Sequence, residues 1–192
     1  GNRAEAKRLG EKIYNSEIGQ KNRVNKMMLS TTLGQAYFFD GDFDQAKTLL
    51  EAVMSLYDFE KDIDLNIDFG FDPYMMAVGN LMSIAVMSGQ FAQGEKYRTL
   101  CLEHAQKTDN KAIVLTGYTW GTCFYFLAND RRGMREWCSN ARKTSPEVFE
   151  NEWIQRYFNM NEDWTRYEIS SGLNVVKEDV DSGQTGILAW YE

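Results

Sequence analysis

The segment from Leu33 to Ala46, LGQAYFFDGDFDQA, is the most informative part of this sequence. Its apolar residues recur at the three- and four-residue spacing of an α-helix on both sides of a central Asp40-Gly41-Asp42. The glycine predicts a helix end, and Asp42, three residues before Gln45, predicts the N-cap of the next helix. Because so short a turn leaves neighbouring helices antiparallel, the segment predicts a helical hairpin.

The order of small and large side chains predicts how this hairpin packs. Gly34 and Ala46 are small, so the two helices can approach closely while larger side chains fill the space beside the contact. This is the pattern of a tetratricopeptide repeat. The residues that carry it are Leu33, Gly34, Tyr37, Gly41, Phe43 and Ala46.

The pattern returns less completely further along the chain. In the second copy the turn glycine, the aromatic residue and the small residue of the second helix are Gly89, Phe91 and Gly94. In the third copy Gly121 takes the place of the first small residue and Gly133 that of the second. The second small residue thus recurs at positions 46, 94 and 133, at intervals of 48 and 39. Both intervals exceed the regular period of about 34 residues, which predicts longer connections between hairpins.

Strand signals are almost absent, and the two prolines follow capping residues in Asp72-Pro73 and Ser145-Pro146, where helices are expected to begin. We therefore predict an all-α fold of about 10 helices. Their approximate ranges are 2–17, 23–39, 43–57, 73–88, 91–107, 110–128, 131–143, 147–159, 162–178 and a last one from about 184.

These helices predict a tetratricopeptide-like right-handed superhelix of antiparallel hairpins, in one domain over residues 1–192. Within it, 1–20 is the end of a preceding repeat, and 147–192 is a degenerate repeat. The three recognisable repeats are 23–57, 73–107 and 110–143. The chain starts without Met and ends inside an expected helix, so we expect a fragment of a longer protein.

Composition excludes several function classes. A formal net charge of −7 argues against nucleic acid, and the cluster Arg131, Arg132, Arg135, Arg142 and Lys143 is interpreted as a solvated helix face. No apolar stretch is long enough for a membrane span. The three cysteines lack CxxC spacing, so we expect buried, reduced thiols in a cytoplasmic protein. With His104 as its one histidine, the chain predicts no metal site, no cofactor and no catalytic base.

Beyond the repeats, the sequence resembles the C-terminal tetratricopeptide region of bacterial adenylate/guanylate cyclase-type multidomain proteins and related signalling ATPases. The resemblance covers residues 1–143 well and 144–192 loosely. It rests on the Leu33–Ala46 segment, the helix LLEAVMSLYD at 49–58, the element FGFDP at 69–73 and the segment 127–132. It implies a parent protein with cyclase and P-loop ATPase domains. This chain has no GxxxxGK[ST] motif, so we do not expect it to be an enzyme itself.

The leading hypothesis is a regulatory module that binds a protein or peptide, including upstream domains of the same protein, in a groove lined by the first helix of each hairpin. The candidate groove residues are Asn25, Met28, Thr32, Gln35, Tyr74, Asn80, Tyr118 and Thr122. Inter-repeat packing is the alternative role for each of them. Two alternative functions stay open: a sensor that binds a small ligand between hairpins, and an oligomerisation module.

Overall fold

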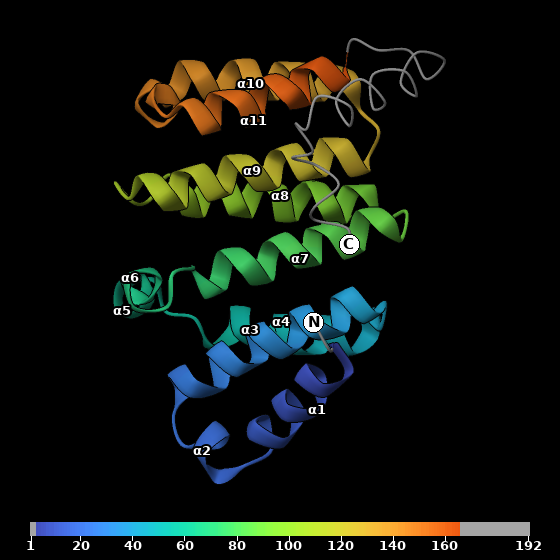
Figure 1. Ribbon diagram of the computed structural model, residues 1–192, viewed down its shortest axis with the longest axis vertical. Helices are drawn as coiled ribbons and strands as arrows, with labels where there is room; N and C mark the ends of the chain where they lie inside the picture. The colour runs from blue at the N-terminus through green and yellow to red at the C-terminus, as the bar shows by residue number, and fades with distance from the viewer. Residues whose placement is uncertain (1–2, 166–192) are drawn as a thin grey trace. The chain divides into compact units, whose positions relative to one another are not determined.

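A computed structural model of the protein describes residues 3–165, and within them every regular element is a helix (Figure 1). The predicted all-α, repeat-like fold is confirmed, whereas the handedness of a superhelix stays a prediction. The chain forms two compact units, which divide between Asp130 and Arg131, and each is described by itself. The helices of the first unit are α1 Arg3–Tyr14, α2 Glu17–Gln20, α3 Arg23–Asp40, α4 Phe43–Leu56, α5 Phe59–Asp62, α6 Leu65–Phe69, α7 Pro73–Met87, α8 Phe91–Ala105 and α9 Lys111–Leu127.

The predicted hairpin of α3 and α4 is confirmed. Gly41 adopts the left-handed conformation (φ 80°) that ends α3, and Asp42 accepts a hydrogen bond from the Gln45 N–H at 3.2 Å. A Cβ atom on Gly34 would lie 2.9 Å from the Leu50 side chain, so this position requires glycine for the close approach of the two helices. Tyr37 donates a hydrogen bond to Glu11 at 2.6 Å, which joins α3 to α1.

The second hairpin, α7 and α8, has the same turn at Gly89 (φ 75°). Gly94 again marks a close approach, because a Cβ there would lie 2.6 Å from Val86. The aromatic position behaves differently. Phe91, expected to fill the space beside the helix contact, is 52% exposed.

The predicted alignment of the third copy is wrong by one residue. Asn129 (φ 53°) occupies the left-handed turn position at the end of α9 that Gly41 occupies after α3. Counting from this turn, Gly121 corresponds to Leu33 instead of Gly34, and Gly133 falls one residue short of the position of Ala46. Asparagine tolerates the left-handed conformation, so this turn lacks the glycine by which the other two were recognised.

Helix α7 lies at the centre of the first unit, where it contacts α3, α4, α8 and α9. Twelve of its 15 residues are buried, which explains why its apolar residues cover all sides and not one stripe. A Cβ atom on Gly79 would lie 2.1 Å from Trp120 of α9, and one on Gly117 of α9 would lie 2.8 Å from Ala105 of α8. These two glycines let the second hairpin and α9 pack closely, and the repeat pattern did not identify them.

The long connection between the first two hairpins, predicted as a linker, contains the short helices α5 and α6. Asp62 at the end of α5 is 1% exposed and accepts hydrogen bonds from Arg23 at 2.5 and 2.6 Å and from the Asp58 N–H at 2.8 Å. Arg23 also donates to the Leu56 carbonyl at 2.7 Å. Burial by itself raises the pKa of Asp62, but the hydrogen bonds from Arg23 and Asp58 outweigh it, so the pKa lies below its usual value.

In the second unit, the sequence predicts one helix over 147–159 and another over 162–178. The predicted break between them, at residues 160–161, is wrong because a single helix continues through it. The described elements are α10 Arg131–Thr144, the 3₁₀ helix η1 Pro146–Glu150 and α11 Glu152–Trp164. Asn151 provides the N-cap of α11 by accepting hydrogen bonds from the N–H groups of Trp153 and Ile154 at 2.9 and 3.4 Å. The Ser145-Pro146 pair therefore begins only a 3₁₀ turn. The helix expected from about 184 lies outside the described residues.

The sequence suggested that the arginines of α10 form a solvated helix face, but two of them contact residues of the following elements. Arg142 forms an ion pair with Glu162, donates to Asn159 at 2.8 Å and lies 5.7 Å from the Phe149 ring centre. Arg131 lies 5.6 Å from the ring of Trp164. These contacts hold α11 against α10.

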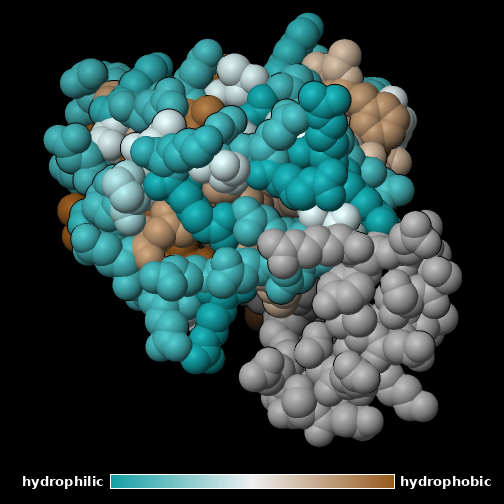
Figure 2. Space-filling view, turned by 90° about the horizontal axis from the view of Figure 1, so that it is seen from above, coloured by the Kyte–Doolittle hydropathy of each residue, from teal (hydrophilic) through white to brown (hydrophobic). Residues whose placement is uncertain are grey.

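Hydrophilic residues cover most of the described surface in Figure 2. None of the helices between residues 3 and 165 has the length and apolar character of a membrane span.

Candidate functional site

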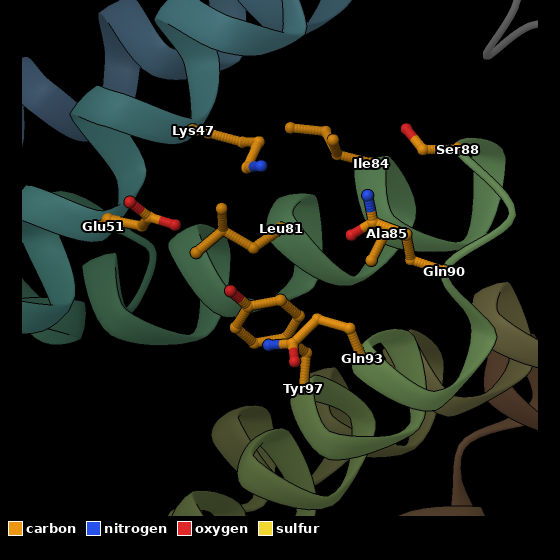
Figure 3. A pocket seen from close by; sticks show the side chains of 9 residues that line it. All are labelled: Lys47, Glu51, Leu81, Ile84, Ala85, Ser88, Gln90, Gln93 and Tyr97. Carbon is orange, nitrogen blue, oxygen red and sulfur yellow. The ribbon is translucent and has the colours of Figure 1, made fainter.

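A pocket of about 250 Å³ lies in the first unit between α4, α7 and α8 (Figure 3). Buried residues of α7 form the floor of this pocket, while α4 and α8 form its walls. The lining residues are Lys47, Glu51, Leu81, Ile84, Ala85, Ser88, Gln90, Gln93 and Tyr97.

The floor of the pocket is apolar. Leu81, Ile84 and Ala85 all belong to α7 and are separated by the three- and four-residue spacing that places side chains on one face of a helix. Leu81 and Ile84 also belong to the buried core shared by α3, α4 and α7. The floor is thus the edge of the core and is held in place by it.

The walls of the pocket are polar. Lys47 and Glu51 lie one turn apart on α4, and Gln93 and Tyr97 lie one turn apart on α8. Ser88 is at the end of α7 and Gln90 in the turn, and both line the same pocket. Figure 3 shows the Lys47 and Glu51 side chains on the α4 side, facing Tyr97 and Gln93 across the α7 residues.

Within the described part of the chain, the polar side chains of this pocket make no hydrogen bond or ion pair with one another or with other residues. An ammonium group, a carboxylate, two amides and two hydroxyls thus surround an apolar floor, with donors and acceptors available to a ligand. Such a mixture fits a ligand that is itself part apolar and part hydrogen-bonding.

A second cluster of polar residues is buried where the first two hairpins meet. Asp72, the N-cap of α7, accepts a hydrogen bond from the Met75 N–H at 2.9 Å with one carboxylate oxygen. Its other oxygen lies 2.9 Å from Nε2 of His104 and accepts from the Tyr57 hydroxyl at 3.1 Å. The cluster therefore joins the end of α4, the start of α7 and the end of α8.

Aromatic rings enclose this cluster. The Tyr74 ring stacks on His104 with centres 4.7 Å apart, and Tyr57 and Phe59 meet the imidazole edge-on at 5.4 Å each. The pKa of Tyr57 is raised by burial, by the negative charge of Asp72 and by the hydrogen bond that Tyr57 donates to Asp72. The phenol therefore stays protonated and remains a donor. His104 is 5% exposed, so its position is that of a packed residue.

The structure places the eight residues predicted for a partner groove in different environments. Asn25, Met28, Thr32 and Gln35 lie along one face of α3, where Thr32 is exposed and the other three are half-buried. Asn80, Tyr118 and Thr122 are buried, and Tyr74 stacks on His104. The side chains of Asn80 and Thr122 donate to carbonyls of their own helices, which is the packing role that the sequence left open.

Sequence reasoning missed the residues of the α4–α7–α8 pocket. It looked for a groove on the first helix of each hairpin, whereas this pocket takes its walls from the second helices. One signal was available: Lys47 follows the small residue Ala46 and Gln93 precedes the small residue Gly94. Small residues bring helices together, so polar neighbours of these positions lie at the rim of the contact.

The buried thiols of Cys101 and Cys138 lack the lowered pKa of a reactive cysteine. Burial raises the pKa of Cys101, with a further contribution from the negative charge of Asp72, and burial raises the pKa of Cys138 to about 12. Within residues 3–165, no group of three or more metal-binding side chains is close enough to hold an ion.

Comparison of the chain with protein-family models, with curated proteins and with solved structures finds no match.

Proposed function

We propose that this chain is an interaction scaffold that holds a polypeptide segment and has no enzymatic role of its own. The observation that carries the proposal is the α4–α7–α8 pocket, in which unpaired polar side chains surround an apolar floor. The resemblance found in the sequence adds a finer proposal. The module is cytoplasmic and regulatory, and the segment belongs to a cyclase or ATPase domain of the same signalling protein.

The size of the pocket favours a polypeptide over a metabolite. Pockets that enclose drug-sized ligands have volumes of about 300–1,000 Å³. A pocket of about 250 Å³ falls below that range and suits one or two side chains of a longer partner. A small ligand bound between hairpins remains the second candidate, because the pocket does lie between helices of two successive hairpins.

The surroundings of the pocket also support a binding role. Its floor belongs to the shared core, and the Asp72 cluster holds both ends of the second hairpin. A rigid site loses little conformational entropy when a ligand binds, so more of the contact energy contributes to affinity.

The proposal is tested by selecting peptides from a random displayed library on the purified chain, then measuring their affinities by fluorescence anisotropy. Saturable binding of selected peptides, with protection of helical amides in hydrogen–deuterium exchange, is the expected result. A panel of metabolites that changes tryptophan fluorescence, with no peptide enriched, would favour the small-ligand sensor. Light scattering that shows self-association in place of either would favour oligomerisation.

A further inference from the structure

The α4 wall of the α4–α7–α8 pocket carries two opposite charges in a fixed order. Lys47 and Glu51 are one turn apart on α4, about 6 Å along the helix axis. In Figure 3 the Lys47 ammonium group lies on the side of Ile84, and the Glu51 carboxylate lies on the side of Leu81. A ligand that lies along α7 therefore meets a negative group at one end of the floor and a positive group at the other.

The length of the pocket along α7 sets the length of the ligand. From Leu81 to Ser88, which both line the pocket, the helix advances about 10 Å, which equals about three residues of extended chain. Two residues on either side of a central one are about 6.7 Å apart in an extended chain, close to the separation of Lys47 and Glu51 along α4. The amides of Gln90 and Gln93 are available to the backbone N–H and C=O groups of such a segment.

From this order of charges we infer that the pocket binds an extended peptide with one aliphatic residue flanked by an acidic and a basic residue. The inference rests on the proposed function and names the partner. The aliphatic side chain lies on Leu81, Ile84 and Ala85. The acidic residue pairs with Lys47 and the basic residue with Glu51, while hydrogen bonds from the peptide backbone to Gln90 and Gln93 fix the direction in which the peptide binds, so only one order of its charges fits.

The test uses two labelled peptides of identical composition, Gly-Ser-Asp-Leu-Lys-Ser-Gly and Gly-Ser-Lys-Leu-Asp-Ser-Gly, and fluorescence anisotropy at low ionic strength. We expect the wild-type chain to prefer one order by about fivefold, since each exposed ion pair contributes modestly. The double variant Lys47→Glu/Glu51→Lys exchanges the two charges and is expected to reverse the preference. High salt reduces the preference in both proteins.

Two further measurements separate the anchor from the charges. Replacing the central leucine of the peptide by glycine is expected to weaken binding at least about tenfold, because apolar burial is lost. Ser88→Trp, at an exposed position on the pocket, is expected to block binding, whereas Thr99→Trp, at an exposed position of α8 outside the pocket, is expected to leave it unchanged. Equal melting temperatures of the two tryptophan variants establish that both are folded.

The inference is overturned if the wild-type chain binds both peptide orders equally, binds neither, or keeps its preference when the charges are exchanged. These results leave the proposed function intact when library-selected peptides still bind and protect amides elsewhere, such as those along the Asn25–Gln35 face of α3. If no polypeptide of either kind binds, the proposed function fails as well.

Discussion

The turns inside the hairpins and the connection between the first two hairpins are built in different ways. At Gly41, Gly89 and Asn129 the chain reverses through one left-handed residue, and the backbone hydrogen bonds around it join residues three to five positions apart. The connection from α4 to α7 instead runs through α5 and α6, and its two ends are held by the buried carboxylates of Asp62 and Asp72. Local backbone geometry is sufficient for a tight turn, whereas the long connection requires partners from distant parts of the sequence.

The two aspartate N-caps, Asp42 and Asp72, show the same difference between local contacts and contacts with distant parts of the sequence. Each accepts a hydrogen bond from the backbone N–H three residues later. Asp42 is exposed, and its side chain makes only this hydrogen bond within the described residues, whereas Asp72 is buried and also binds His104 and Tyr57. The same capping residue can therefore have a local role in one place and join three helices in another.

The largest expected effect comes from Asp72→Ala. The substitution removes the cap of α7 and leaves the buried groups of His104 and Tyr57 without their acceptor, so we expect unfolding to require about 3 kcal/mol less. Urea denaturation followed by circular dichroism measures the change. The matched variant Asp42→Ala removes only an exposed cap and is expected to lower the free energy of unfolding by about 1 kcal/mol. Equal losses in the two variants would show that the Asp72 cluster contributes nothing beyond capping.

A smaller effect is expected from Arg23→Met, which removes the charged partner of Asp62. Breaking a buried ion pair leaves a charge without compensation. Arg23 is 36% exposed, so water already shares in its solvation, and we expect a loss of about 2 kcal/mol in place of the larger values found for fully buried pairs. Lys61→Met removes the positive partner of the exposed Lys61–Asp58 ion pair and serves as the control. We expect it to change the free energy of unfolding little.

The same pair predicts a dependence on pH. Because the pKa of Asp62 is lowered in the folded state, its ion pair stabilises the fold fully above the pKa of an unfolded aspartate, about 3.9. That contribution is lost as the pH falls through the lower, folded-state pKa. The difference in stability between the wild type and Arg23→Met is therefore expected to be greatest near pH 7 and to narrow below about pH 4. A difference that stays constant from pH 7 to pH 3 would contradict the role given to the Asp62 charge.

The smallest expected effect concerns a tight turn. Apart from its chain neighbours, Gly41 has no atom within 4 Å of the position of a Cβ, so Gly41→Ala adds only the backbone cost of a left-handed alanine, about 1 kcal/mol. Gly41→Asn is expected to cost less than half as much, since asparagine already occupies this conformation at Asn129. Thermal unfolding of the two variants checks the order. An alanine variant as stable as the asparagine variant would show that the turn does not depend on its left-handed residue.

The sequence predicted most of the helices because their signals are local. Periodicity, the capping aspartates at Asp42 and Asp72, and the turn glycines each act over a few residues, and α3, α4, α7 and α8 begin and end within about two residues of their predicted limits. The prediction was wrong where a local signal was weak or shared by two residues. Asn129 takes the turn position that Gly41 and Gly89 have in the first two copies, and Asn151, not Ser145, begins α11.

The candidate site was not predictable in the same way. The pocket takes its residues from α4, α7 and α8. The positions of Lys47 and Gln93 beside Ala46 and Gly94 indicate the rim of a helix contact, but they do not show that these two residues line the same pocket. Three of the eight groove residues proposed from the sequence, Asn80, Tyr118 and Thr122, are buried. Helical periodicity tells which residues share a face, but it does not tell which neighbour covers that face.

By itself, the sequence determined the helical class of this protein, its hairpin turns and the close contacts at Gly34 and Gly94, because these depend on backbone conformation and on the size of nearby side chains. The tertiary structure alone decided that His104 pairs with Asp72, that Arg23 pairs with Asp62, and that Lys47 and Gln93 face the same pocket. The partners in each of these pairs are between 32 and 46 residues apart in the chain. Contacts at such separations form only when packed helices bring the partners together, so no short segment of sequence encodes them.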